Sequence, residues 1–390
     1  VCAELRVAYL PELRSLPREW LNGILHSALA GDLYVLRRSR GFTAFVISIL
    51  RSERTSDPFD STRDFILVME STMKFLEDHV SAFGVEERRA VVAVSSTQDT
   101  AATISDETGL HALQLSKLTV AGSHCLNMLR IVFEDALHAQ QAMPYIGRAL
   151  EISMRIFSSN IWIIRNSASM LFASLCKKIG KAQDSSLEIN ECYNHSGVIE
   201  SARSVQVTGN SGREFFSRYP TVYKYLQEEM QIMVQGEEWE TSQKLYLAFL
   251  VLSLLSPAQD EISSDVSLNA FVDPLIRFCG ARRGEVRSMI AAACVPLVES
   301  EQLLTVSKSI LDMAIAASQQ GQIRNNTIHG CLVLFATVVN NHRLLLSTDQ
   351  KAQNVISWAA SFPLLGSQLE RHGHQISPWS MAAYCQALEA

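Results

Sequence analysis

The sequence lacks the segments that mark several large protein classes. Its longest apolar run, residues 246–255, is too short to span a bilayer as a helix, so we expect no membrane insertion. Only 19% of its 390 residues are charged, and the formal net charge is −6. This balance argues against a generic nucleic-acid binder, because such proteins neutralise phosphates with a basic face.

Sequence motifs of enzymes and metal sites are also missing. The chain contains no glycine-rich phosphate loop and no HExxH, GxSxG or CxxC pattern. Cys192 and His195 have a metal-like spacing, but no second ligand pair accompanies them in the sequence. Most of the eight cysteines lie within apolar helical patterns, which suits small buried hydrophobes in a reducing compartment. We therefore expect no catalytic residue, no metal, no cofactor and a cytoplasmic location.

What the sequence does contain is apolar residues at helical spacing. Between residues 157 and 175 they recur at steps of three and four, as Phe157, Ile161, Ile164, Ala168, Leu171 and Leu175. An aliphatic residue followed by an arginine precedes four apolar helical patterns, at Arg37, Arg165, Arg287 and Arg324. The last two arginines are 37 residues apart, the length of a two-helix repeat. The sequence predicts an all-α fold, a HEAT/armadillo-like α-solenoid of stacked antiparallel helix pairs.

A polar segment separates two groups of predicted helices. Residues 181–212 are rich in Ser, Asn, Glu, Gln and Gly and have no helical period, so we expect a disordered loop. Residues 1–180 then form N-terminal helical repeats, and residues 213–390 form C-terminal helical repeats.

Two short patterns predict where helices begin. Ser211 and Glu214 have the spacing of a capping box, in which each side chain bonds the backbone N–H of the other residue. Ser377 precedes Pro378, the arrangement of an N-cap followed by proline at the first helical position.

The recurring arginines have two interpretations. In stacked helix pairs, an arginine at this position can bond a carboxylate or the helix C-terminal carbonyls of the neighbouring repeat. For Arg165, Arg287 and Arg324 we favour this buried ladder over a surface contact.

A cluster of cations near residue 40 calls for a different interpretation. Arg37, Arg38 and Arg40 cannot all turn inward, since adjacent helical positions differ by about 100°. We predict a partner- or tRNA-binding site formed by Arg37, Arg38, Ser39, Arg40 and Gly41, with Arg51 and Arg54 extending the basic patch. A plain solvated face is the alternative.

Several segments resemble signatures of the THADA (thyroid adenoma-associated) family. Residues 161–172 resemble the motif WxVRNSxxxLF through Trp162, Arg165, Asn166 and Ser167. Residues 212–220 match GREFFSRYP at every position, as Gly212, Arg213, Glu214, Phe215, Phe216, Ser217, Arg218, Tyr219 and Pro220. Residues 37–42 are similar to the start of RRSAGLP, with Arg40 in place of the alanine, and residues 124–130 resemble HxLNxLR.

The resemblance implies a specific role. Members of this family are large cytosolic helical-repeat proteins, and this chain is similar to a central fragment of them. The yeast-type member is the non-catalytic partner of an FtsJ-like 2′-O-methyltransferase, and the complex methylates the ribose at position 32 of the tRNA anticodon loop. By resemblance we expect a non-catalytic adaptor that binds the methyltransferase and, through the complex, tRNA. The alternatives are a cytosolic scaffold that contacts a membrane calcium pump or regulates energy metabolism without RNA, and a karyopherin-like cargo carrier.

Overall fold

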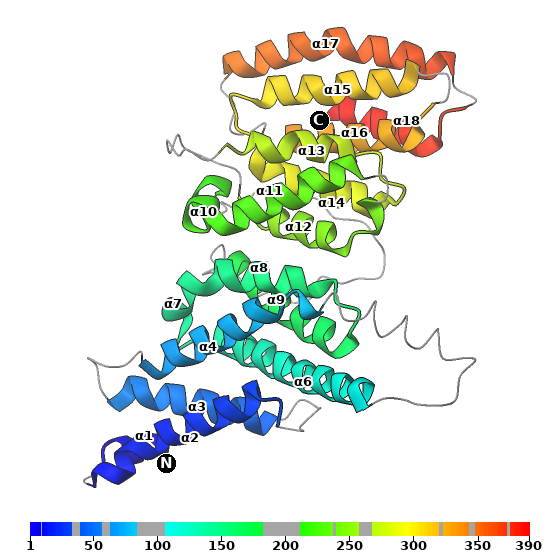
Figure 1. Ribbon diagram of the computed structural model, residues 1–390. Coiled ribbons are helices and arrows are strands. Elements are labelled where there is room, and N and C mark those ends of the chain that lie inside the picture. Colours follow the sequence, from blue (N-terminus) through cyan, green and yellow to red (C-terminus); the bar gives the residue numbers. More distant parts are fainter. Residues whose placement is uncertain are drawn as a thin grey trace. The chain divides into compact units, whose positions relative to one another are not determined.

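The structure, a computed structural model, consists of helices arranged in two compact units (Figure 1). Unit 1 comprises residues 1–178, and unit 2 comprises residues 179–390. The described residues are 1–8, 10–32, 40–56, 63–83, 106–181, 211–236, 239–256, 267–319, 323–342, 348–372 and 375–390. Across these ranges there is no strand, only one isolated bridge between Ser211 and Ser256. The all-α fold class predicted from the sequence is confirmed.

Unit 1 is built mainly from helices of about three to eight turns. They are α1 (Cys2–Arg6), α2 (Pro11–Leu29), α3 (Arg40–Ser56), α4 (Arg63–His79), α6 (Asp106–Glu134), α7 (Ala139–Ala142), α8 (Ile146–Phe157) and α9 (Trp162–Lys181). A short 3₁₀ turn, Met143–Tyr145, leads into α8. Helix α2 packs on α4 and α6, and α4 also packs on α8.

The apolar pattern of each helix explains which face it buries. In α4, Phe65, Val68, Met69, Met73 and Leu76 are all at most 1% exposed, and their steps of three and four place them on one face. The opposite face of α4 carries carboxylates that reach α8, where Arg148 pairs with both Glu70 and Glu77.

The first helix that lies wholly in unit 2 is that of the GREFFSRYP segment. Its helices are α10 (Gly212–Arg218), α11 (Pro220–Gln235), α12 (Gln243–Ser253), α13 (Asn269–Phe278), α14 (Gly284–Cys294), α15 (Leu303–Gln319), α16 (Asn325–His342), α17 (Thr348–Arg371) and α18 (Pro378–Glu389). Two 3₁₀ turns, Trp239–Thr241 and Val295–Leu297, precede α12 and follow α14.

Alternate helices of unit 2 stack in two rows (Figure 1). One row contains the contacts α11–α13 and α15–α17, and the other contains α12–α14, α14–α16 and α16–α18. Contacts α11–α12, α13–α14 and α15–α16 join the rows. Two rows of helices joined pair by pair are the arrangement of an α-solenoid, as the sequence predicts.

Close backbone approach helps to join these pairs. Gly330 of α16 lies so near the Cys279 carbonyl at the end of α13 that any Cβ at residue 330 would overlap it.

A second glycine, in unit 1, is required by a turn. Gly31 follows α2 with φ of 69°, a left-handed conformation that glycine adopts without steric cost.

Both predicted helix caps are present. Glu214 N donates to Ser211 Oγ at 3.3 Å while Ser211 N donates to Glu214 Oε2 at 3.2 Å, which completes the capping box of α10. Ser377 Oγ accepts from Ser380 N at 3.1 Å, and Pro378 occupies the first position of α18.

None of the described helices combines the length and the apolar character that crossing a membrane would require.

Candidate functional site

The predicted binding cluster lies at the start of α3. Arg37, Arg38 and Ser39 are outside the described residues, and only the backbone of Arg40 is described. Gly41 is an exposed residue in the first turn of α3. A binding role for these five residues stays a prediction. The polar segment 182–210, with Cys192 and His195, is likewise outside the described residues.

Arg51 is paired with a buried carboxylate. Its Nη2 and Nε donate to Oδ1 of Asp135 at 2.6 and 3.1 Å, and Nδ1 of His138 lies 2.5 Å from Oδ2 of the same carboxylate. Burial by itself would raise the pKa of Asp135, but hydrogen bonds from Arg51 and His138 outweigh it and lower that pKa. The prediction that Arg51 extends a basic patch is therefore wrong, because Asp135 neutralises its charge.

Arg165 makes a local hydrogen bond. Its Nη1 donates to the carbonyl of Ser159 at 3.0 Å, in the turn between α8 and α9. In the described part of the chain no carboxylate forms an ion pair with it. The predicted bond to a neighbouring repeat is therefore wrong for Arg165, which instead fixes the angle at which α9 leaves α8.

The other residues of the RNS block divide between the core and the surface. Ser167 is buried, and its Oγ lies 3.1 Å from Ser123 Oγ and 3.4 Å from Asn127 Nδ2, both on α6. Asn166 is half-buried, and its Nδ2 lies 4.0 Å from Met170 Sδ. Trp162 is 66% exposed at the start of α9, a high exposure for so large an apolar side chain.

The GREFFSRYP segment is mainly a packing element. Phe215, Phe216 and Tyr219 are at most 5% exposed. Phe216 stacks on Phe271 of α13 with ring centroids 5.2 Å apart, and Phe215 and Tyr223 contact it edge-on. Burying so much aromatic area holds α10 and α11 against α13.

Several other residues of this segment also hold α10 in place. Arg213 forms an ion pair with Glu299, in the loop before α15. Gly212 is buried, and a Cβ there would lie 3.3 Å from the Pro296 carbonyl. Arg218 is exposed, and Pro220 is the first residue of α11. Of the motif's charged side chains, Arg213 pairs with Glu299, while Glu214, which completes the capping box, and Arg218 are exposed.

Arg287 occupies the buried position that the ladder predicts. Its Nη1 donates to the carbonyls of Ala281 at 2.6 Å and Arg282 at 3.1 Å, beyond the end of α13. Nη1 also lies 3.3 Å from Asn326 Oδ1, and Nε donates to His329 Nδ1 at 3.0 Å, so α16 of the next pair is bound too. The prediction that Arg287 is buried and bonds the neighbouring pair is confirmed, but its partners there are an amide and an imidazole in place of a carboxylate or carbonyls.

Two pKa shifts are consistent with this network. Burial lowers the pKa of Arg287, although Glu285 and Glu240 oppose the shift. Burial, together with the charge of Arg287, lowers the pKa of His329. His329 is therefore neutral at pH 7, as it must be for Nδ1 to accept from Arg287.

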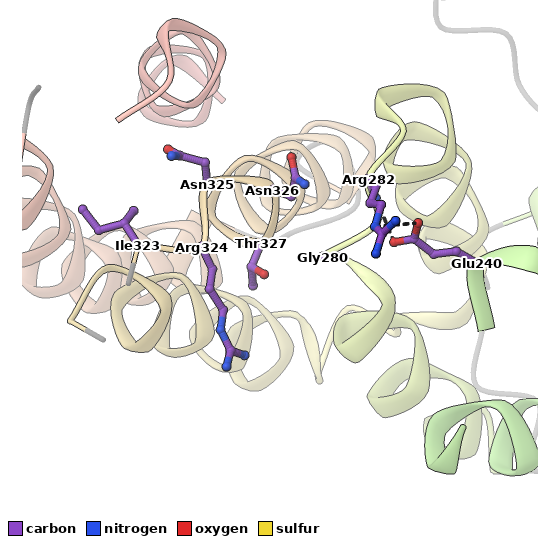
Figure 2. A pocket seen from close by; sticks show the side chains of 8 residues that line it. All are labelled: Glu240, Gly280, Arg282, Ile323, Arg324, Asn325, Asn326 and Thr327. Atoms are coloured by element: carbon purple, nitrogen blue, oxygen red, sulfur yellow. Dashed lines mark hydrogen bonds and ion pairs between the residues drawn. The ribbon is translucent and has the colours of Figure 1, made fainter. Parts of the chain in front are cut away.

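Arg324 does not occupy the equivalent buried position. Its side chain is exposed, and the ladder prediction is wrong for this residue. It lies instead on the rim of a cavity of about 430 Å³ beside the starts of α14 and α16 (Figure 2). The cavity is lined by Glu240, Gly280, Arg282, Ile323, Arg324, Asn325, Asn326 and Thr327.

The lining of this cavity is mostly polar and includes two arginines and one carboxylate. Ile323 is its one aliphatic residue, and it has no aromatic residue. Figure 2 shows Arg282 beside Glu240, whose Oε1 accepts from Arg282 N at 2.9 Å and whose Oε2 is 3.9 Å from Arg282 Nε. Sequence reasoning missed this site, although the pair Arg282–Arg283 before a predicted helix was an available signal.

Among the described residues, no three His, Cys, Asp or Glu side chains are placed to hold a metal ion. Burial raises the pKa of Cys294 and of Cys176 to about 12, so these thiols are protonated and unreactive at neutral pH.

Two family models match consecutive parts of the chain. The model described as "THADA/TRM732, DUF2428" matches residues 1–163, and the model described as "Trm732, C-terminal TPR repeats" matches residues 165–338. TPR repeats are helix pairs, which agrees with the two rows of helices in unit 2.

Curated relatives from animals and fission yeast are similar to this chain. "tRNA (32-2'-O)-methyltransferase regulator THADA" of Mus musculus is 27% identical over 332 residues, which are 82% of this chain and 14% of that protein. The protein of the same name from Canis lupus familiaris is 27% identical over 351 residues, 87% of this chain and 15% of the relative. "tRNA (32-2'-O)-methyltransferase regulator trm732" of Schizosaccharomyces pombe is 27% identical over 222 residues, 56% of this chain and 13% of that relative. The chain thus spans about one seventh of the length of these relatives. No solved structure matches it.

Proposed function

Because the chain belongs to the THADA/TRM732 family, we propose that it is a non-catalytic part of a regulator of a tRNA ribose 2′-O-methyltransferase acting at position 32 of the anticodon loop. The observation that carries this proposal is the pair of family models, which together account for residues 1–163 and 165–338. The relatives that share these segments are named regulators of that reaction.

The proposed partners are an FtsJ-like methyltransferase and, through the complex, its tRNA, and the proposed location is the cytoplasm. Stacked helix pairs suit this role, since they present extended surfaces on which two macromolecules can be held in register. The regulator would then act by positioning the enzyme and the RNA, which lowers the entropic cost of bringing them together.

Co-expression of the chain with an FtsJ-like methyltransferase tests this proposal. We expect the two proteins to co-purify and the chain to increase 2′-O-methylation of ribose 32 in added tRNA, measured by mass spectrometry of the digested RNA. Absence of both effects would contradict the proposal. Co-purification of a membrane calcium pump in place of the methyltransferase would favour the scaffold alternative.

A further inference from the structure

The cavity beside α14 and α16 has two exposed arginines in its lining. The side chain of Arg282 is 88% exposed, and Arg324 is exposed on another part of the rim. The lining residues of α16, Asn325–Thr327, lie in its first turn, where backbone N–H groups have no partner within the helix. Glu240 is the one carboxylate in the lining.

Two asparagines of this turn have different roles. Asn325 is engaged at both ends, because its Nδ2 donates to the Gln375 carbonyl at 2.8 Å and its Oδ1 accepts from Ser377 N at 2.9 Å. Asn326 uses its Oδ1 to accept from Arg287, which leaves the Nδ2 donor as the outward end of an exposed side chain. The buried arginine thus fixes which end of Asn326 a ligand meets.

Glu240 orients Arg282 without neutralising it fully. Its Oε1 is bonded to the backbone N–H of Arg282, and its Oε2 is 3.9 Å from Nε, near the limit for an ion pair. The terminal nitrogens of Arg282 are therefore left for a ligand, and Arg324 adds a second guanidinium. Two exposed guanidinium groups and the Asn326 amide in the lining of one cavity are groups that bind the oxygens of a phosphate.

We propose that this cavity binds a phosphate of the tRNA backbone, an inference that rests on the proposed function for the identity of the RNA. The lining favours a phosphate over an acidic protein segment. Protein interfaces depend on apolar or aromatic anchors in desolvated pockets, and this open, polar cavity has Ile323 as its one apolar side chain and no aromatic residue. Without an aromatic residue on which a base could stack, the contact is to the backbone and independent of sequence.

RNA binding by the full 390-residue chain tests the inference. The probe is a fluorescent anticodon stem-loop RNA, titrated at several KCl concentrations with wild type, Arg282→Gln and Arg324→Gln. Each variant should bind severalfold more weakly and lower the slope of log K against log salt by about 1. Glu240→Gln should bind more tightly, since it removes the only carboxylate of the lining.

Arg371→Gln is the matched control, because Arg371 is an exposed arginine of unit 2 that does not line the cavity. It should leave both affinity and slope unchanged, and all variants should keep the wild-type melting temperature. Wild type that binds no RNA, or Arg282→Gln and Arg324→Gln with unchanged slopes, would overturn the inference. So would variants that keep RNA binding and lose the methyltransferase, which would make the cavity a protein-docking site. If the variants bind RNA more weakly but the chain does not stimulate methylation, the phosphate site stands and the proposed function fails.

Discussion

At the scale of single residues, the same local pattern leads to different environments. Arg287 and Arg324 each follow an aliphatic residue at the start of a helical pattern, yet Arg287 is 9% exposed and Arg324 is exposed on the cavity rim. The difference lies in the residues brought near by folding. Arg287 meets the carbonyls beyond α13 and the side chains of Asn326 and His329.

Truncating the buried arginine should therefore be costly. Arg287→Ala leaves the carbonyls of Ala281 and Arg282 and the amide of Asn326 without their charged donor. We expect a loss of about 2–3 kcal/mol in the free energy of unfolding, measured by urea denaturation. Arg324→Ala, the exposed counterpart, should change it by less than about 0.5 kcal/mol. Equal losses for the two variants would show that Arg287 is not a structural link.

The Asp135 network predicts a dependence on pH. The pKa of Asp135 is lower in the folded chain than in the unfolded chain, so the unfolded state binds the proton more readily. The stabilisation is present above the unfolded pKa of about 3.9 and is lost as the pH falls through the folded value. Asp135→Asn should make the urea midpoint less sensitive to pH below about 4 than in wild type. Asp32→Asn, which removes the exposed partner of Lys117, should keep the wild-type pH dependence.

At the scale of elements, the Ser211 side chain caps the start of α10. Ser211→Ala removes the acceptor of Glu214 N and should lower the free energy of unfolding by about 1 kcal/mol. Ser217→Ala, at an exposed position inside the same helix, is the control and should have little effect. If both variants unfold at the same urea concentration as the parent, the capping box does not stabilise α10.

The aromatic cluster of the GREFFSRYP segment gives a larger expected effect. Phe216 is fully buried against Phe271, so Phe216→Ala should cost about 3–5 kcal/mol through lost contacts and the cavity left behind. Trp162→Ala, an exposed aromatic of the RNS block, should stay within about 0.5 kcal/mol of wild type. Thermal unfolding, monitored by far-UV circular dichroism, shows which of the two variants is less stable. The opposite ranking would mean that the motif is a contact surface.

At the scale of the whole molecule, the chain divides into two compact units between residues 178 and 179, near the end of α9. The polar composition of residues 181–212 predicts a loop, and a chain without residues 184–206 should keep its helix content and melting temperature. Circular dichroism on the deleted and parental chains measures both quantities. A large fall in melting temperature would show that this segment contributes to the core. Exchange for a Gly/Ser linker of equal length controls for the shortened connection.

The sequence by itself determined the features that depend on residues within one or two turns of each other. The caps at Ser211 and Ser377 follow from spacings of three residues, and the helical period buries Ile164, Leu171 and Leu175 completely. Phe157 and Ile161 show where this reasoning ends, because α8 stops at Phe157 and α9 begins at Trp162. When apolar residues continue at helical spacing, the pattern does not show where a turn divides it into two helices.

Only the tertiary structure decided which charged groups meet. Arg51 pairs with Asp135, 84 residues further along the chain, and the cavity joins residue 240, residues 280 and 282, and residues 323–327. Helical spacing sets the face on which a side chain lies, but the partner on that face is set by how the helix pairs stack. A buried arginine such as Arg287 and an exposed one such as Arg324 therefore look alike in sequence and differ in role.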